Sequence, residues 1–237
     1  MIRSLLRNGF SIDTLIGLCA SAFVVFCTLP IHEYAHALVA TKLGDDTPRL
    51  SGRLTLNPLA HIDIMGAVMI LLVGFGYAKV VPVNPRNFKN PKAGMALTAA
   101  AGPASNLIMS VIFILLSNIS FVIYCKTNDS IVARVAFLFF FYAAMINISL
   151  AVFNLIPIPP LDGSRIVGLL IPNKIYYQIM KYERYIIIVV FVLLALGWLS
   201  TPLSRLTDKV LYGISWLVSK PFGEYGDMFM QIVLSAM

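Results

Sequence analysis

The chain has 237 residues, of which 59% are hydrophobic and only 12% are charged. Soluble globular domains carry about 25% charged residues, so this composition excludes an ordinary soluble enzyme and indicates an integral membrane protein. The formal charge of +7 does not indicate nucleic-acid binding, because the chain has no cluster of basic residues interleaved with aromatic ones. Basic residues scattered among apolar segments are more typical of the cytoplasmic side of a bilayer.

Long apolar segments divide the chain into candidate spans. A helix needs roughly 20 apolar residues to cross the hydrocarbon core of a bilayer. Four segments reach or approach that length, at about 12–41, 93–119, 132–156 and 184–200. We expect the first to be an uncleaved span, because no small-residue cleavage site interrupts it. The prediction is an all-α polytopic membrane protein with one integral membrane domain over residues 1–237 and no appended module.

Shorter segments between and after these spans predict local structure. Residues 51–56 and 79–84 have strand-like composition and are bounded by turn residues, although Pro82 limits the second to a sheet edge. We therefore predict a small membrane-associated β-sheet or hairpin. Residues 207–218 and 227–236 predict amphipathic or short apolar helices, which we expect to lie at the membrane interface.

The first apolar segment contains the motif His32-Glu33-Tyr34-Ala35-His36, which uses two of the three histidines in the chain. On a helix, side chains at positions i and i+4 lie on one face, so both imidazoles can bind one Zn²⁺ while Glu33 lies beside the metal. Burying two imidazoles and a carboxylate in an apolar span without a cation is costly. The motif therefore indicates a zinc hydrolase rather than two core histidines.

Pro30 stands two residues before this motif. Proline inside a helix removes one hydrogen bond and clashes with the carbonyl four residues earlier, here that of Phe26. We expect the helix to kink or restart at this point, which would open space for water beside the metal.

A hydrolytic zinc site usually has three protein ligands and one open position, so a third ligand must come from elsewhere. The candidates are His61, Asp63, Asp162 and Glu183. We favour Asp162, because prolines and Gly163 hold it in a stiff turn after the third long segment, although a simple Asp-Gly turn is the alternative. His61 is the second candidate, but its place in the opening turn of a short helix favours a structural role.

Membrane topology gives a further argument for Asp162. The His motif lies toward the C-terminal end of the first span, and any other ligand must reach the same depth. Two crossings, by 93–119 and 132–156, return the chain to that side before Asp162. This holds only if 62–78 is re-entrant or lies along the interface, so the two predictions depend on each other.

Four motifs together resemble the site-2 protease family of intramembrane zinc metalloproteases. They are His32-Glu33-x-x-His36, Leu56 to Asp63, Gly102-Pro103-Ala104-Ser105-Asn106, and Asn154 to Gly163. The resemblance covers about 12–170 and implies a protease core of three spans, with one zinc ion held by His32, His36 and Asp162. The absence of a PDZ-like insertion is typical of the minimal branch of the family. We expect at least one further span, together with the interfacial helices, in about 175–237.

In the expected reaction, zinc lowers the pKa of a water molecule, and Glu33 accepts the proton as that water attacks the scissile carbonyl. Asn154 is the first candidate for stabilising the developing negative charge or holding the substrate backbone. A hydrogen bond to its own helix is the alternative for Asn154. Asn106 is a further candidate, either for the substrate or as a partner of the metal ligands. Gly102-Pro103 is expected to let the second span pack closely against the metal helix.

These observations predict a zinc-dependent intramembrane endopeptidase that cleaves in or near transmembrane segments, with a transmembrane protein or peptide substrate and the lipid bilayer as partners. A non-catalytic adaptor with the same fold is the alternative, but it would not need Glu33. A metal transporter would show polar residues on several spans or internal repeats. Residues 42–92 and 157–184 carry eleven of the eighteen Lys and Arg residues, so we expect the active site to lie toward the cytoplasmic side. We also expect the membrane to be a bacterial inner membrane.

Overall fold

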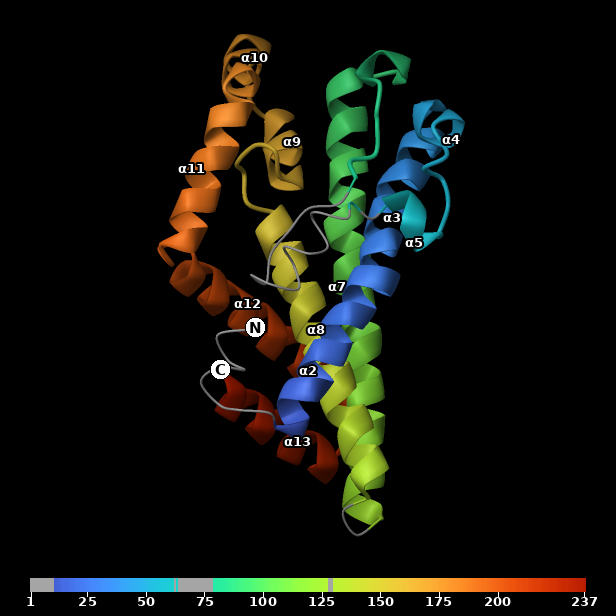
Figure 1. The fold of residues 1–237 in the computed structure, drawn as a ribbon, viewed down its shortest axis with the longest axis vertical. Coiled ribbons are helices and arrows are strands. Elements are labelled where there is room, and N and C mark those ends of the chain that lie inside the picture. The colour runs from blue at the N-terminus through green and yellow to red at the C-terminus, as the bar shows by residue number, and fades with distance from the viewer. Residues whose placement is uncertain (1–10, 62, 64–78, 128–129) are drawn as a thin grey trace.

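The computed structural model describes residues 11–61, 63, 79–127 and 130–237, and every regular element among them is helical (Figure 1). Three helical segments are long and apolar enough to cross a membrane: Ile12–Lys42, Pro91–Lys126 and Ile131–Asn154. The shortest has 24 residues. At about 1.5 Å per residue, a helix of that length exceeds the ~30 Å hydrocarbon core of a bilayer. The three predicted core spans are confirmed, and the chain is an integral membrane protein.

The first span is continuous but not uniform. It consists of α2 (Ile12–Phe23), the π-helical turn η1 (Val24–Thr28) and α3 (Leu29–Lys42). Pro30 has no amide proton to donate and would clash with the carbonyl of Phe26 in a regular α-helix, and the wider π turn accommodates this conflict. The irregularity predicted before the His motif is present, and α3 begins as a new helical unit with Pro30 in its first turn.

The second and third spans form an antiparallel helical hairpin. They are α7 (Pro91–Lys126) and α8 (Ile131–Asn154), which lie side by side (Figure 1). The hydroxyl of Ser117 donates a hydrogen bond across their interface to the carbonyl oxygen of Phe137 at 3.1 Å. The first span crosses this hairpin, with α2 against α8 and α3 against α7. This crossing brings the His motif next to the N-terminal half of α7.

Two C-terminal helices pack against the α7–α8 hairpin (Figure 1). They are α12 (Ser200–Ser219) and α13 (Glu224–Ala236), joined by the 3-10 turn η3 (Lys220–Phe222). Phe229 of α13 is fully buried, and its ring centroid is 5.9–6.1 Å from those of three phenylalanines of α7 and α8. Both predicted C-terminal helices are confirmed, while their location at the membrane interface stays a prediction.

Three shorter helices follow the third span: α9 (Asp162–Gly168), α10 (Asn173–Lys181) and α11 (Glu183–Ala195). The sequence predicts a further span at 184–200, but α11 has 13 residues and ends before Gly197, whose φ of +78° breaks the helix. At about 1.5 Å per residue α11 is about 20 Å long, which is short of the ~30 Å hydrocarbon core. The further span is therefore not found among the described helices.

The two segments predicted as strands are irregular, and no strand is present in the part of the chain that the structure describes. The first, residues 51–56, connects α4 (Thr47–Leu50) to α5 (Pro58–His61). The amide of Arg53 donates a hydrogen bond to the carbonyl oxygen of Pro48 at 2.8 Å, which closes a turn after α4. A local turn thus uses a backbone donor that a β-ladder would need.

The second expected strand, residues 79–84, leads into the 3-10 turn η2 (Pro85–Asn87). Pro82 has no amide proton to donate to a ladder, and the amide of Asn84 donates instead to the carboxylate of Asp45 at 2.7 Å. The buried Asp45 therefore ties this segment to the end of the first span. The stretch 62–78, predicted to be re-entrant or interfacial, lies outside the described residues except for Asp63.

Candidate metal centre

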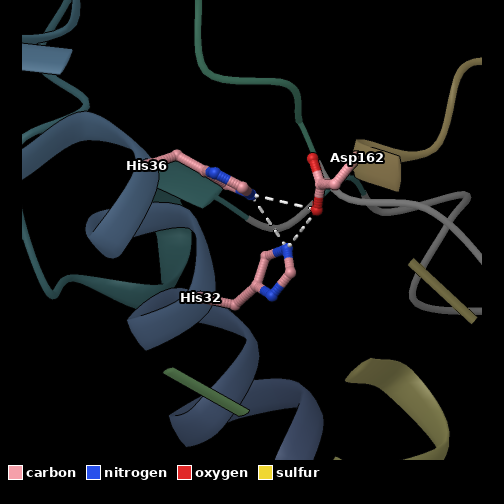
Figure 2. A group of neighbouring side chains, drawn as sticks. All are labelled: His32, His36 and Asp162. Atoms are coloured by element: carbon pink, nitrogen blue, oxygen red, sulfur yellow. Dashed lines mark hydrogen bonds and ion pairs between the residues drawn. The ribbon is translucent and has the colours of Figure 1, made fainter. Parts of the chain in front are cut away.

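Three side chains from two distant segments converge beside α7, and we call them the His–Asp cluster (Figure 2). His32 and His36 lie on α3, and Asp162 is the first residue of α9. The two Nε2 atoms are 3.0 Å apart, and Oδ2 of Asp162 lies 3.5 Å from Nε2 of His32 and 3.4 Å from Nε2 of His36. Among the described residues, this is the one group of His, Cys, Asp and Glu side chains that could hold a metal ion.

The helical register of α3 explains why both imidazoles face the same point. Residues four positions apart lie one above the other on a helix face, and both His32 and His36 are buried. Their rings meet edge to face, with 4.6 Å between centroids and 85° between planes. Because the rings are not stacked, their Nε2 atoms converge on one space, as Figure 2 shows.

Asp162 reaches the histidines because the chain turns sharply after α8. Leu161 is extended, with φ −66° and ψ 153°, and α9 begins directly after it. Gly163 is required at this turn, since a Cβ there would lie 2.2 Å from the carbonyl oxygen of Leu155. Burial raises the pKa of the Asp162 carboxyl, but hydrogen bonds and charges from both histidines outweigh it and hold the pKa below its usual value. The turn therefore brings one carboxylate oxygen to both imidazoles.

One face of α7 forms a wall behind the cluster. Thr98, Gly102 and Asn106 are spaced four residues apart and so lie along one side of the helix. A Cβ at Gly102 would lie 2.3 Å from Nε2 of His36 and 2.6 Å from Cε1 of His32. Only glycine lets α7 approach the imidazoles this closely, so the close packing predicted for the second span is confirmed.

The ring nitrogens that point away from the cluster are held by the same face of α7. Nδ1 of His36 donates a hydrogen bond to the carbonyl oxygen of Thr98 at 2.7 Å. Nδ1 of His32 lies 3.1 Å from the side-chain nitrogen of Asn106. Metal-binding histidines commonly use their second nitrogen in this way, which fixes the ring orientation. The role of Thr98 was not predicted from the sequence, because its main-chain carbonyl is the acceptor and every residue type has one.

The other candidate ligands lie elsewhere. Nε2 of His61 is 2.7 Å from the carbonyl oxygen of Thr55, so this ring stabilises its own loop. Glu183 forms an ion pair with Arg165 at 3.7 Å. Neither of them, nor Asp63, joins the His–Asp cluster. Of the four candidates for a third ligand, Asp162 is the one that the structure brings to the histidines.

The candidate catalytic residues differ in their surroundings. Glu33 is partly buried on α3, and its carboxylate has no hydrogen-bond or ion-pair partner within the described ranges, so it is available to accept a proton. Asn154 donates a hydrogen bond from Nδ2 to the carbonyl oxygen of Leu150 at 3.0 Å, which is the alternative considered for it from the sequence. Asn106 is 1% exposed, and its side chain contacts the ring of His32, a candidate ligand.

The His–Asp cluster suits zinc by donor type and by spacing. Two imidazole nitrogens and one carboxylate oxygen are a common three-ligand set for catalytic zinc, which leaves a fourth position open. Ligands at about 2.0–2.1 Å from a tetrahedral ion lie about 3.3–3.4 Å from one another. The three separations in the cluster are 3.0, 3.4 and 3.5 Å. The side chains therefore need only small adjustments to bind the ion.

Comparisons with known proteins agree with this chemistry. The sequence profile described as Peptidase family M50 matches residues 115–197, a stretch that includes Asp162. YwhC of Bacillus subtilis (strain 168), whose name is that of a zinc metalloprotease, is 43% identical over 166 residues, which are 69% of this chain and 74% of YwhC. Rip2 of Mycolicibacterium smegmatis, named in the same way, is 30% identical over 57% of this chain and 51% of Rip2.

Similarity to longer relatives covers a smaller share of their length. Rip3 of Mycobacterium tuberculosis, also named as a zinc metalloprotease, is 29% identical over 62% of this chain but only 29% of Rip3. No solved structure shows a significant match. The match to YwhC, in contrast, extends over most of both chains. The chain therefore belongs to peptidase family M50, the site-2 protease family, and is a zinc metalloprotease.

Proposed function

We propose that this protein is an intramembrane endopeptidase that uses zinc held by His32, His36 and Asp162 to hydrolyse peptide bonds in or near the transmembrane segments of other membrane proteins. The observation that supports this most directly is the position of the His–Asp cluster among membrane-spanning helices. Two of its members belong to the first span, and the second span forms the wall behind them.

The depth of the cluster follows from the helix geometry. The first span ends at Lys42, so His36 and His32 lie about 9 and 15 Å from that end at about 1.5 Å per residue. The opposing wall at Gly102 lies about 16 Å from the start of α7 at Pro91 on the same basis. Against a hydrocarbon core of ~30 Å, these depths favour substrates that present their scissile bond from within or near the bilayer.

The residues of the cluster region have distinct roles in this reaction. Bound zinc would lower the pKa of a water molecule toward about 7 and polarise the scissile carbonyl. Glu33 would accept a proton from the attacking water and later donate it to the departing amine. Asn154 remains the candidate for binding the substrate backbone, because its amide nitrogen has two protons and donates one of them to the carbonyl of Leu150.

The substrate must also change its structure to be cleaved. A transmembrane helix keeps its peptide groups in internal hydrogen bonds, because lipid offers no other partners. We therefore propose that a substrate helix unwinds locally beside the cluster before its peptide bond reaches Glu33. The partners are then a transmembrane protein or peptide and the surrounding lipid.

The cluster is proposed to face the cytoplasmic side of a bacterial inner membrane. Residues 42–92 and 157–184, which follow the first and third spans in the sequence, carry eleven of the eighteen Lys and Arg residues, and such an excess favours the cytoplasm. Thiol labelling tests this with a protein that lacks its own cysteines and carries Arg86→Cys at an exposed position. An impermeant maleimide is expected to label it only after the inner membrane is opened, and labelling in intact spheroplasts would place the cluster outside.

Reconstitution into liposomes tests the proposed activity. The zinc-loaded protein is incubated with a set of single-span peptides, and the products are mapped by mass spectrometry. We expect cleavage inside the spans or within a few residues of their ends, and no products with Glu33→Gln. Cleavage restricted to soluble peptides would refute intramembrane proteolysis, whereas full activity of Glu33→Gln would remove Glu33 from the mechanism.

A further inference from the structure

We propose that Asn106 is a positioning residue that presents its side-chain oxygen to Nδ1 of His32 and so holds this imidazole in the tautomer that leaves Nε2 free for zinc. The inference rests on the proposed ligation of zinc by the His–Asp cluster. Of the two roles considered for Asn106 from the sequence, it takes the partnership with the metal ligands and assigns the atom, the ring nitrogen and the effect on the tautomer of His32.

The outer nitrogens of the two imidazoles face different chemical groups. Nδ1 of His36 is 2.7 Å from the carbonyl oxygen of Thr98, which can only accept a hydrogen bond. Nδ1 of His36 therefore carries a proton, and in the neutral ring that binds a metal its Nε2 offers a lone pair to the cluster. Nδ1 of His32 faces the side-chain amide of Asn106 at 3.1 Å. An amide can offer either an accepting oxygen or a donating nitrogen, and the two choices have opposite consequences.

The choice at Asn106 decides whether His32 can bind a metal through Nε2. If the amide nitrogen donates to Nδ1, the proton of the neutral ring must lie on Nε2. That proton would point into the cluster, where Nε2 of His36 is 3.0 Å away, and would occupy the site of the metal bond. If the amide oxygen faces Nδ1, the ring donates to it and Nε2 is free. Zinc ligation by both histidines therefore requires the oxygen.

The surroundings of the amide do not by themselves select one orientation, so the choice rests on the requirement for a free Nε2 on His32. Asn106 is 1% exposed, and with its nitrogen toward His32 its Oδ1 has no hydrogen-bond partner among the described residues. Rotating the amide by half a turn exchanges oxygen and nitrogen with little change in shape. The oxygen then accepts a hydrogen bond from Nδ1 of His32, and the nitrogen takes the position at which Oδ1 has no partner, so the amide makes one hydrogen bond to this ring in either orientation. One face of α7 would thus supply an acceptor to each imidazole, Thr98 to one and Asn106 to the other, with Gly102 between them.

Two substitutions and a matched control separate this role from a purely structural one. Asn106→Asp keeps an acceptor at the same position and removes the donor, whereas Asn106→Leu keeps the approximate size and removes the acceptor. Asn118→Leu is the control. Asn118 is likewise a buried asparagine of α7, but its side chain donates to the carbonyl oxygen of Ile114 in its own helix at 2.9 Å.

Zinc affinity is the main readout. Each metal-free protein in detergent is titrated with zinc against a competing chelator, and helical content is followed by circular dichroism. We expect Asn106→Leu to bind zinc about 10–100-fold more weakly than wild type, the usual effect of removing such a partner. Asn106→Asp and Asn118→Leu should bind close to the wild-type affinity. The visible spectrum of cobalt-substituted Asn106→Asp should match that of the wild-type protein, because the ligand geometry is unchanged.

The possible results are distinct. Wild-type affinity in Asn106→Leu would overturn the inference, and so would an equally large loss in Asn106→Asp, since it would show that the donor matters. If Asn106→Leu does not fold, the affinity of Asn106→Asp relative to wild type still decides between oxygen and nitrogen. A folded wild-type protein that binds no zinc would refute the proposed zinc site itself, and the inference with it.

Discussion

Replacing Gly102 with alanine is expected to disrupt the zinc site while leaving the helical bundle folded. A Cβ at this position would lie 2.3 Å from Nε2 of His36 and 2.6 Å from Cε1 of His32. Non-bonded atoms of this kind prefer about 3.5–4.0 Å, so the methyl group must displace the imidazoles, or all of α3, by about 1 Å. Overpacking of this size typically costs about 1–3 kcal/mol.

The same displacement is larger than the metal site tolerates. Zinc–ligand distances vary by only about 0.2 Å, so a shift of about 1 Å in either imidazole breaks the coordination geometry. We expect zinc affinity to fall about 100-fold, and proteolysis to fall about 100-fold or more because the reacting groups are misplaced. Both are measured on one preparation, the first by chelator competition and the second by cleavage of a reconstituted peptide.

Gly17 offers a matched control for this experiment. It also lies in a membrane span, but a Cβ there would meet nothing closer than the ring of Tyr142 at 3.9 Å, an ordinary contact. Gly17→Ala should therefore keep wild-type affinity and activity. Unchanged zinc affinity and proteolysis in Gly102→Ala would refute the close approach of α7 to the imidazoles, and with it the geometry assigned to the cluster.

Three further predictions follow from the contacts of single side chains. Asp162→Ala should lose stoichiometric zinc, measured by metal analysis after dialysis. His61→Ala should keep it, because the His61 ring is hydrogen-bonded to the carbonyl of Thr55. The reverse result would make His61 the third ligand. Glu33→Gln should keep zinc but lose proteolysis by about 10²–10⁴-fold in the liposome assay, the usual effect of removing a general base. Burial raises the pKa of Asp45, but hydrogen bonds from neighbouring loop residues outweigh it and lower the pKa below 3.8. The stabilisation of the folded state by ionised Asp45 is thus complete above about pH 4, and it is lost as the pH falls through the lowered pKa. Asp45→Asn should therefore lower the free energy of unfolding by about 2 kcal/mol at pH 7 and by much less at pH 3. Thermal unfolding that shows the same difference between variant and wild type at both pH values would contradict this.

The histidine half of the candidate site could be predicted from the sequence because it depends on one helix. The spacing of His32 and His36 places two imidazoles on one face of any α-helix, whatever packs against it. The third ligand needed a global argument, since Asp162 is separated from the motif by two spans. Counting crossings favoured Asp162 on the condition that 62–78 is re-entrant or interfacial, and this stretch lies outside the described residues except for Asp63. The structure accordingly brings Asp162 to the histidines.

Composition alone predicted secondary structure poorly in short segments, because their backbone groups could form hydrogen bonds in several ways. Residues 51–56 and 79–84 are rich enough in strand-forming residues, yet turns and the buried Asp45 carboxylate take up donors that a ladder would use. The apolar stretch 184–200 similarly predicts a span, but Gly197 ends the helix early. In both cases a single residue, with an unusual backbone conformation or a buried charge, had more influence on the local structure than the average composition of the segment.

Sequence spacing could suggest that α7 contacts the two histidines, but it could not assign the individual contacts. Thr98, Gly102 and Asn106 share one face of α7, and that much follows from helical periodicity. Which of them meets which imidazole depends on the register of α3 against α7, and this register is set by packing along both helices. Because Gly102 admits no side chain at the crossing point, the carbonyl of Thr98 and the amide of Asn106, one turn to either side, are each brought to one ring. A single glycine thus couples the packing of two spans to the tautomers of two proposed zinc ligands.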